Sequence, residues 1–133
     1  MNLQLPRDKM KLLQFIGKGL CALTLHINWS EPLIEDGEVL LIKPTDLNDF
    51  YAKASDLDKS NLFFILLNSF HHYFDLGETE KAAHLSFLLA YYLFVPLTPP
   101  ASCDLALHYI KQALSLNPLD EYRKWLSLME KGN

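Results

Sequence analysis

Five histidines and two cysteines are the residues of this chain that could support metal or nucleophilic chemistry. Neutral imidazole is a common metal ligand, and His71 and His72 are adjacent. Adjacent side chains on a helix point about 100° apart, so this pair does not converge on one ion. We therefore predict neither a metal site nor a cofactor.

Nucleophilic catalysis needs a thiol or hydroxyl with a base within hydrogen-bonding reach. Cys21 and His26 are a local pair of this kind, and their spacing of five residues puts them on different faces of a helix. The sequence also lacks a glycine-rich phosphate loop and a zinc-protease helix signature. We predict no catalytic residues and a protein that is not an enzyme.

The elements that would position these residues are helices. Apolar residues recur at helical spacing, and prolines, glycines and capping residues separate the runs. The predicted helices cover residues 7 to 28, 47 to 55, 61 to 76, 80 to 95, 102 or 104 to 116, and 119 to 131. Capping is expected from Thr45 or Asp46, from Asp58 or Ser60, and from Thr79. The third helix is apolar nearly all round, which predicts a central place in the core.

Residues 29 to 45 are the least helical segment, with Pro32 and Pro44 on either side of Asp36-Gly37. A hairpin and an extended loop both fit this pattern, although an isolated ribbon is only marginally stable. The fold class expected is all-α, with antiparallel helical hairpins, an N-terminal helix and this irregular segment. A chain of 133 residues is predicted to form a single domain, 1–133, in which residues 1–59 hold the N-terminal helices and loop and residues 60–133 hold the hairpins.

Composition excludes several classes of partner. The net charge is −4 and the basic residues are spread along the chain, which argues against nucleic acid. Residues 30 to 60 carry eight acidic and three basic side chains, a pattern that fits either a solvated face or a basic partner. No apolar stretch is long enough for a membrane span, and Cys21 and Cys103 look like reduced thiols. We expect a cytoplasmic protein without membrane insertion.

The segment DLALHYIKQALSLNP resembles the second helix of a tetratricopeptide repeat, on the small residues Ala106 and Ala113 and the helix-ending Pro118. The segment DLGETEKAA resembles the turn of such a repeat, with Tyr73 before Gly77 and Ala82 after it. The resemblance covers residues 60 to 131. It implies a right-handed stack of helical hairpins with a groove that binds peptides or protein segments. Small bacterial members include chaperones of secretion systems.

In that register the residues facing the groove are Phe64, Leu67, His71 and Phe74, which recur at spacings of three and four. We predict a non-enzymatic adaptor or chaperone that holds a peptide or helix of a partner protein there. Burial of Phe64 and Leu67 in the core is the competing interpretation. Two other functions remain open: a self-associating homodimer, and a helical sensor that binds a small ligand beside Phe87 and the Tyr91-Tyr92 pair.

Overall fold

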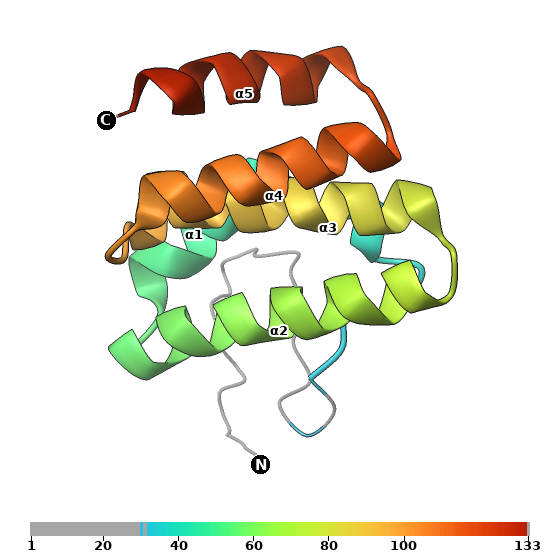
Figure 1. Cartoon of the computed structure of the whole chain (residues 1–133). Coiled ribbons are helices and arrows are strands. Elements are labelled where there is room, and N and C mark those ends of the chain that lie inside the picture. Colours follow the sequence, from blue (N-terminus) through green and yellow to red (C-terminus); the bar gives the residue numbers. More distant parts are fainter. Residues whose placement is uncertain (1–29, 31, 133) are drawn as a thin grey trace. The chain divides into compact units, whose positions relative to one another are not determined.

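The computed structural model describes residue 30 and residues 32 to 132 of the chain, and these are all helix, turn or irregular segment (Figure 1). The elements in chain order are η1 (Val39–Leu41), α1 (Pro44–Lys53), α2 (Asp56–Asp75), α3 (Thr79–Tyr92), η2 (Leu93–Leu97), α4 (Ser102–Leu116) and α5 (Asp120–Lys131). The predicted all-α class is confirmed. The predicted first helix, 7 to 28, lies outside the described residues.

Two compact units divide the chain between Ile65 and Leu66, inside α2. The prediction of a single domain stays a prediction. In the N-terminal unit, the segment predicted as a hairpin or loop contains no strand over residue 30 and residues 32 to 45. Instead the chain turns and forms the single 3-10 turn η1. The hairpin alternative is therefore wrong, because the buried Ile34, Val39 and Ile42 lie at uneven intervals of five and three residues, and a two-residue alternation is absent.

Helix α1 begins at Pro44, where the missing N–H of proline costs nothing. The Asp46 carboxylate accepts a hydrogen bond from the Lys43 N–H at 2.9 Å, so it acts from the third helical position. The prediction that Asp46 or Thr45 precedes the helix was wrong by two or three residues. Leu47 and Phe50 form the buried side of α1.

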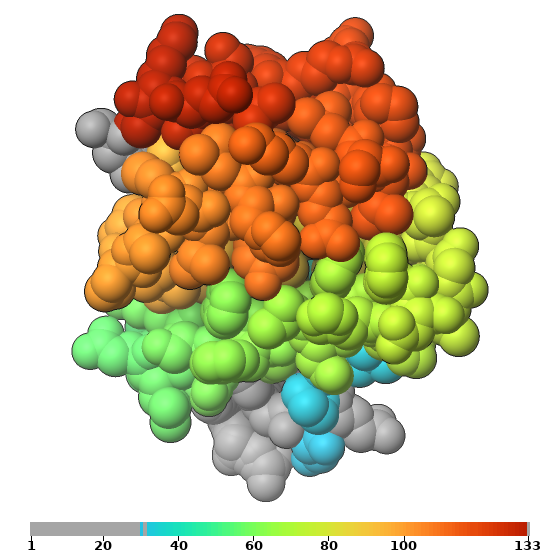
Figure 2. Space-filling model, in the orientation of Figure 1, coloured from blue at the N-terminus to red at the C-terminus, as the bar shows by residue number. Residues whose placement is uncertain are grey.

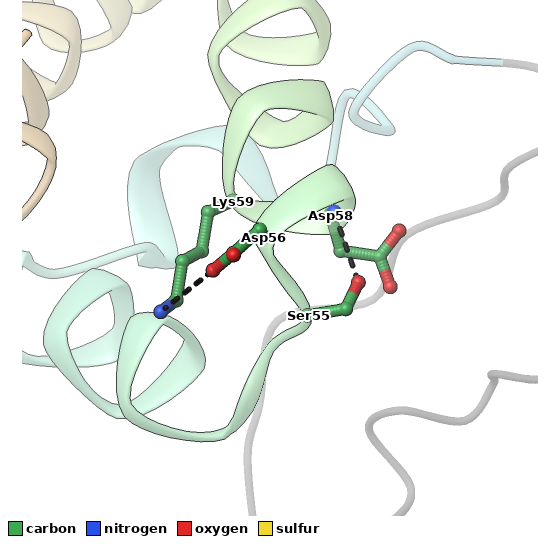
Figure 3. A network of polar contacts seen from close by, with 4 residues as sticks. All are labelled: Ser55, Asp56, Asp58 and Lys59. Carbon is green, nitrogen blue, oxygen red and sulfur yellow. Dashed lines mark hydrogen bonds and ion pairs between the residues drawn. The ribbon is translucent and has the colours of Figure 1, made fainter.

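Helix α2 begins earlier than predicted, at Asp56 (Figure 3). The Ser55 hydroxyl accepts the Asp58 N–H at 3.1 Å, which makes Ser55 the capping residue in place of Asp58 or Ser60. Asp56 forms an ion pair with Lys59 at 3.6 Å, and the Lys59 ammonium lies 4.3 Å from the centre of the Tyr51 ring. The contact between Lys59 and Tyr51 attaches the first turn of α2 to α1.

The turn between α2 and α3 has the left-handed glycine that the sequence predicts. Gly77 has a φ of +77°, the Gly77 N–H bonds to the Phe74 carbonyl at 3.0 Å, and the Glu78 N–H bonds to the Tyr73 carbonyl at 3.0 Å. This pair of bonds is the Schellman motif, which satisfies carbonyls at a helix end. A side chain at residue 77 would strain this conformation.

Helix α3 is the most buried helix of the C-terminal unit, with all of residues 85 to 92 buried. It contacts α4 along its length (Figure 1). Helix α4 in turn contacts α5, which is red beside orange α4 in Figure 2. The prediction that 61 to 76 forms the central helix was wrong, because α2 leaves Phe64 61% and Phe74 44% exposed. Ala82, Ser86 and Ala90 on α3 are small and buried, so neighbouring helices can approach closely.

The end of α3 departs from the predicted stop at Val95. The helix gives way after Tyr92 to the π-helical turn η2, which contains Pro96. Thr98 and Ala101 both have positive φ, at 43° and 64°, although neither is glycine. Helix α4 then begins at Ser102, the first of the two predicted starts, and ends at Leu116 as predicted, and Pro118 separates it from α5.

Candidate functional site

An exposed stripe runs along α2 on the side opposite its buried residues. At 100° per residue its members span an arc of about 100°. Four of them are the predicted partner-binding residues, and the helix adds two more in its first turns. We call this set the α2 stripe: Leu57, Ser60, Phe64, Leu67, His71 and Phe74.

The predicted binding residues differ in how far they reach solvent. Phe64 and Phe74 are 61% and 44% exposed, His71 is exposed and Leu67 is half-buried. The interpretation of Phe64 as a core residue was therefore wrong. Leu57 is 70% exposed and was missed, although its position seven residues before Phe64 is the signal that would have found it.

Aromatic contacts within α2 hold several of these side chains. The Phe74 ring stacks on the buried Phe70 ring, with centroids 5.6 Å apart and planes 25° apart. The Phe70 ring also meets the His71 ring edge to face at 5.2 Å. Phe63 and Phe64 form a similar contact at 5.3 Å. Rings with such neighbours lose little rotamer freedom when a partner covers them, which favours binding.

The residues that carry the repeat resemblance are buried or lie in turns. Ala82, Ala106 and Ala113 are fully buried, and Tyr73 is 2% exposed. Gly77 and Pro118 occupy the two turns described above. The sequence reasoning missed Ser86, whose hydroxyl donates a 2.6 Å hydrogen bond to the Tyr109 carbonyl of α4. Its signal is the i, i+4, i+8 spacing of Ala82, Ser86 and Ala90.

Aromatic side chains also connect α3 to α5. The rings of Phe87 and Tyr122 lie 5.1 Å apart, and those of Tyr91 and Trp125 lie 5.2 Å apart, edge to face. Phe87, Tyr91 and Tyr122 are buried. The Phe87 and Tyr91 rings therefore take part in the packing between α3 and α5.

Burial raises the pKa of the Tyr122 phenol to about 12, and the nearby carboxylates Glu121 and Glu80 contribute to the rise. The folded chain holds this proton more tightly than the unfolded chain does. Tyr122 thus contributes stability that is complete below pH 10 and lost as the pH rises through 12. Burial raises the pKa of Tyr109 as well.

Changing Tyr122 to phenylalanine should flatten the alkaline decline in stability. Between pH 10 and pH 12 we expect the free energy of unfolding of the original chain to fall by roughly 2 kcal/mol more than that of the variant. Urea denaturation followed by circular dichroism at each pH measures this difference. Parallel declines of the two proteins would contradict the assignment.

Metal-binding side chains do not converge in the described segments of the chain. Glu80 with His84, and Asp104 with His108, have the i, i+4 spacing of a helical ligand pair. No group of three or more His, Cys, Asp or Glu side chains arranged to hold a metal occurs among the described residues. Cys103 is half-buried, whereas Cys21 and His26 lie outside the described residues.

Among the described helices, none combines the length and the apolar character needed to cross a membrane. No protein-family model, curated protein or solved structure matches the chain. The assignment of a function therefore depends on the geometry of the α2 stripe and on the packing behind it.

Proposed function

We propose that this chain is a non-enzymatic protein-binding adaptor or chaperone that holds a helix or peptide of a partner protein against the α2 stripe. The observation that carries the proposal is the exposure of two phenylalanine side chains, 61% for Phe64 and 44% for Phe74, on one helix. Aromatic residues supply much of the binding energy at protein interfaces when a partner desolvates them.

The form of the stripe favours a helical or extended partner segment. It is about 100° wide and follows the helix axis, which suits an elongated ligand that meets anchor residues at regular spacing. The proposal includes a tetratricopeptide-like scaffold, which the buried Ala82, Ala106 and Ala113 and the turn at Gly77 support. In this proposal the scaffold does no chemistry and only presents the stripe.

A capture experiment with the full chain tests the proposal. We expect the tagged protein to recover one stoichiometric protein from a lysate of its source organism. The double variant Phe64→Ser/Phe74→Ser should bind that protein, once purified, at least about tenfold more weakly, because it loses two apolar anchors. Isothermal titration calorimetry measures the two dissociation constants.

The matched control is Leu105→Ser/Leu128→Ser, which removes two apolar side chains of 39% and 40% exposure from α4 and α5. This control should bind with the original affinity. Undiminished binding by the phenylalanine variant, with circular dichroism showing an intact fold, would reject the α2 stripe as the binding surface.

A further inference from the structure

Asp36 is the one aspartate or asparagine of the chain that precedes a glycine. Such a pair has a chemistry of its own, because the backbone nitrogen of the second residue can attack the side-chain carbonyl carbon of the first and close a five-membered imide ring. A side chain on the second residue hinders this attack, and Gly37 has none. The pair is therefore the position in the sequence with the least steric protection against ring closure.

The structure leaves both residues of the pair accessible. Asp36 and Gly37 are exposed, and they lie in the turn closed by the hydrogen bond from the Glu38 N–H to the Glu35 carbonyl at 2.9 Å. The Gly37 N–H donates no hydrogen bond to any other residue that the structure describes. No bond to the described part of the chain has to break before the Gly37 nitrogen reacts.

The other aspartates that the structure describes are placed differently. All of them lie in α1, α2, α4 or α5, and each is followed by a residue with a side chain. A helix fixes the backbone ψ angle, and the side-chain carbon reaches the next backbone nitrogen only after that angle changes. Ring closure at these aspartates requires local unwinding of a helix, whereas at Asp36 it requires only movement within a turn.

From these observations we infer that Asp36 is a site of spontaneous covalent modification, at which aspartate rearranges through a cyclic imide to isoaspartate. In the first step the Gly37 nitrogen forms a bond to the Asp36 Cγ, and the hydroxyl on Cγ leaves with the amide proton as water. In the second step water adds to the α-carbonyl of the imide and opens the ring there. The main chain then runs through Cβ and Cγ of residue 36. The rearrangement uses no oxidant or reductant, and the water released in the first step is taken up in the second.

The rearrangement lengthens the main chain between two anchored residues. Isoaspartate adds one atom to the main chain, which is roughly 1.5 Å. Ile34 is 1% exposed and Val39 is 0% exposed, so the turn is held by buried side chains on both sides. The added atom enters the ring that the hydrogen bond between Glu38 and Glu35 closes. We expect this bond to weaken and η1, which begins directly after Glu38, to loosen.

Ageing of the full chain tests the inference. The protein is held in buffer for several weeks at roughly 10 °C below its melting temperature, so that it stays folded. It is then digested and analysed by mass spectrometry with electron-transfer fragmentation, which distinguishes isoaspartate from aspartate by the fragments of the altered backbone. We expect isoaspartate to accumulate at residue 36 at least about tenfold faster than at any other aspartate. Similar rates at all aspartates would overturn the inference.

Two variants connect the reaction to this pair. Gly37→Ala should fold normally, because Gly37 has no positive φ and an added Cβ would meet no described atom within 4 Å. It should form isoaspartate roughly tenfold more slowly, since the methyl group hinders the attack of the nitrogen. Asp36→Glu keeps the charge but would need a six-membered ring, so residue 36 should stay unmodified. An undiminished rate in Gly37→Ala would contradict the role of the exposed glycine.

Thermal unfolding of the aged samples measures the effect on the fold. The melting temperature of the original protein should fall by about 2 to 5 °C as isoaspartate accumulates. Gly37→Ala aged in parallel should keep its melting temperature. An original protein that contains isoaspartate at residue 36 and melts unchanged would overturn the expected loosening of the turn. None of these outcomes depends on the α2 stripe, so they leave the proposed function to its own test.

Discussion

Replacing Phe87 with alanine should lower the free energy of unfolding by about 3 to 5 kcal/mol, the usual range for a buried phenylalanine. The Phe87 side chain is 1% exposed and its ring lies 5.1 Å from that of Tyr122 on α5. The substitution opens a cavity between α3 and α5 and removes one of the two aromatic contacts that join them. Urea denaturation monitored by circular dichroism gives the value.

Phe64→Ala is the control, because it makes the same chemical change at a phenylalanine that is 61% exposed. It should cost roughly 1 kcal/mol or less. A double-mutant cycle with Tyr122→Ala should return a coupling of about 1 kcal/mol for the ring pair. Equal losses for the two phenylalanine variants would mean that α3 and α5 are not packed as described.

Local signals in the sequence were sufficient for much of the C-terminal unit. Pro118 and Asn117 stop α4 at the predicted residue, and Gly77 adopts the predicted left-handed conformation. Such signals act within a few residues, through a missing N–H or a permitted φ angle. They need no knowledge of what packs against the helix, which is why the sequence reveals them.

Burial was harder to predict than helix position. Helices α2 and α3 are both rich in apolar residues, yet α3 is the buried one and α2 exposes Phe64 and Phe74. Periodicity identifies an apolar side only when another side of the helix is polar. Because α2 and α3 are both apolar on most sides, periodicity could not show which of the two helices is buried. The better guide is side-chain size, since Ala82, Ser86 and Ala90 mark the helix that neighbours can approach most closely.

The exact helix starts also depended on competition between capping residues. Ser55, Asp58 and Ser60 can each accept a backbone N–H, and the sequence does not rank them. Ser55 accepts the bond in the structure, so α2 gains an additional turn that contains Leu57. This turn supplies the outermost apolar residue of the α2 stripe, which the predicted helix boundary left out.

Replacing Ala113 with leucine should destabilise the chain by about 3 kcal/mol, the upper end of the usual range for overpacking. Ala113 is fully buried on α4. The 2.6 Å hydrogen bond from the Ser86 hydroxyl to the Tyr109 carbonyl, one turn away, indicates how closely α3 approaches there. Because the Ala113 side chain is fully buried, a leucine there has no free space and a neighbouring helix must move away. Thermal and urea denaturation measure the loss.

Ala52→Leu is the matched control, since Ala52 lies on α1 and is exposed. Leucine has nearly the helix propensity of alanine, so this variant should change the stability by less than about 0.5 kcal/mol. If Ala113→Leu were equally harmless, α4 would have free space beside Ala113. The small residues that carry the resemblance to a tetratricopeptide repeat would then have no packing reason to be small, and the proposed tetratricopeptide-like scaffold would lose its physical basis.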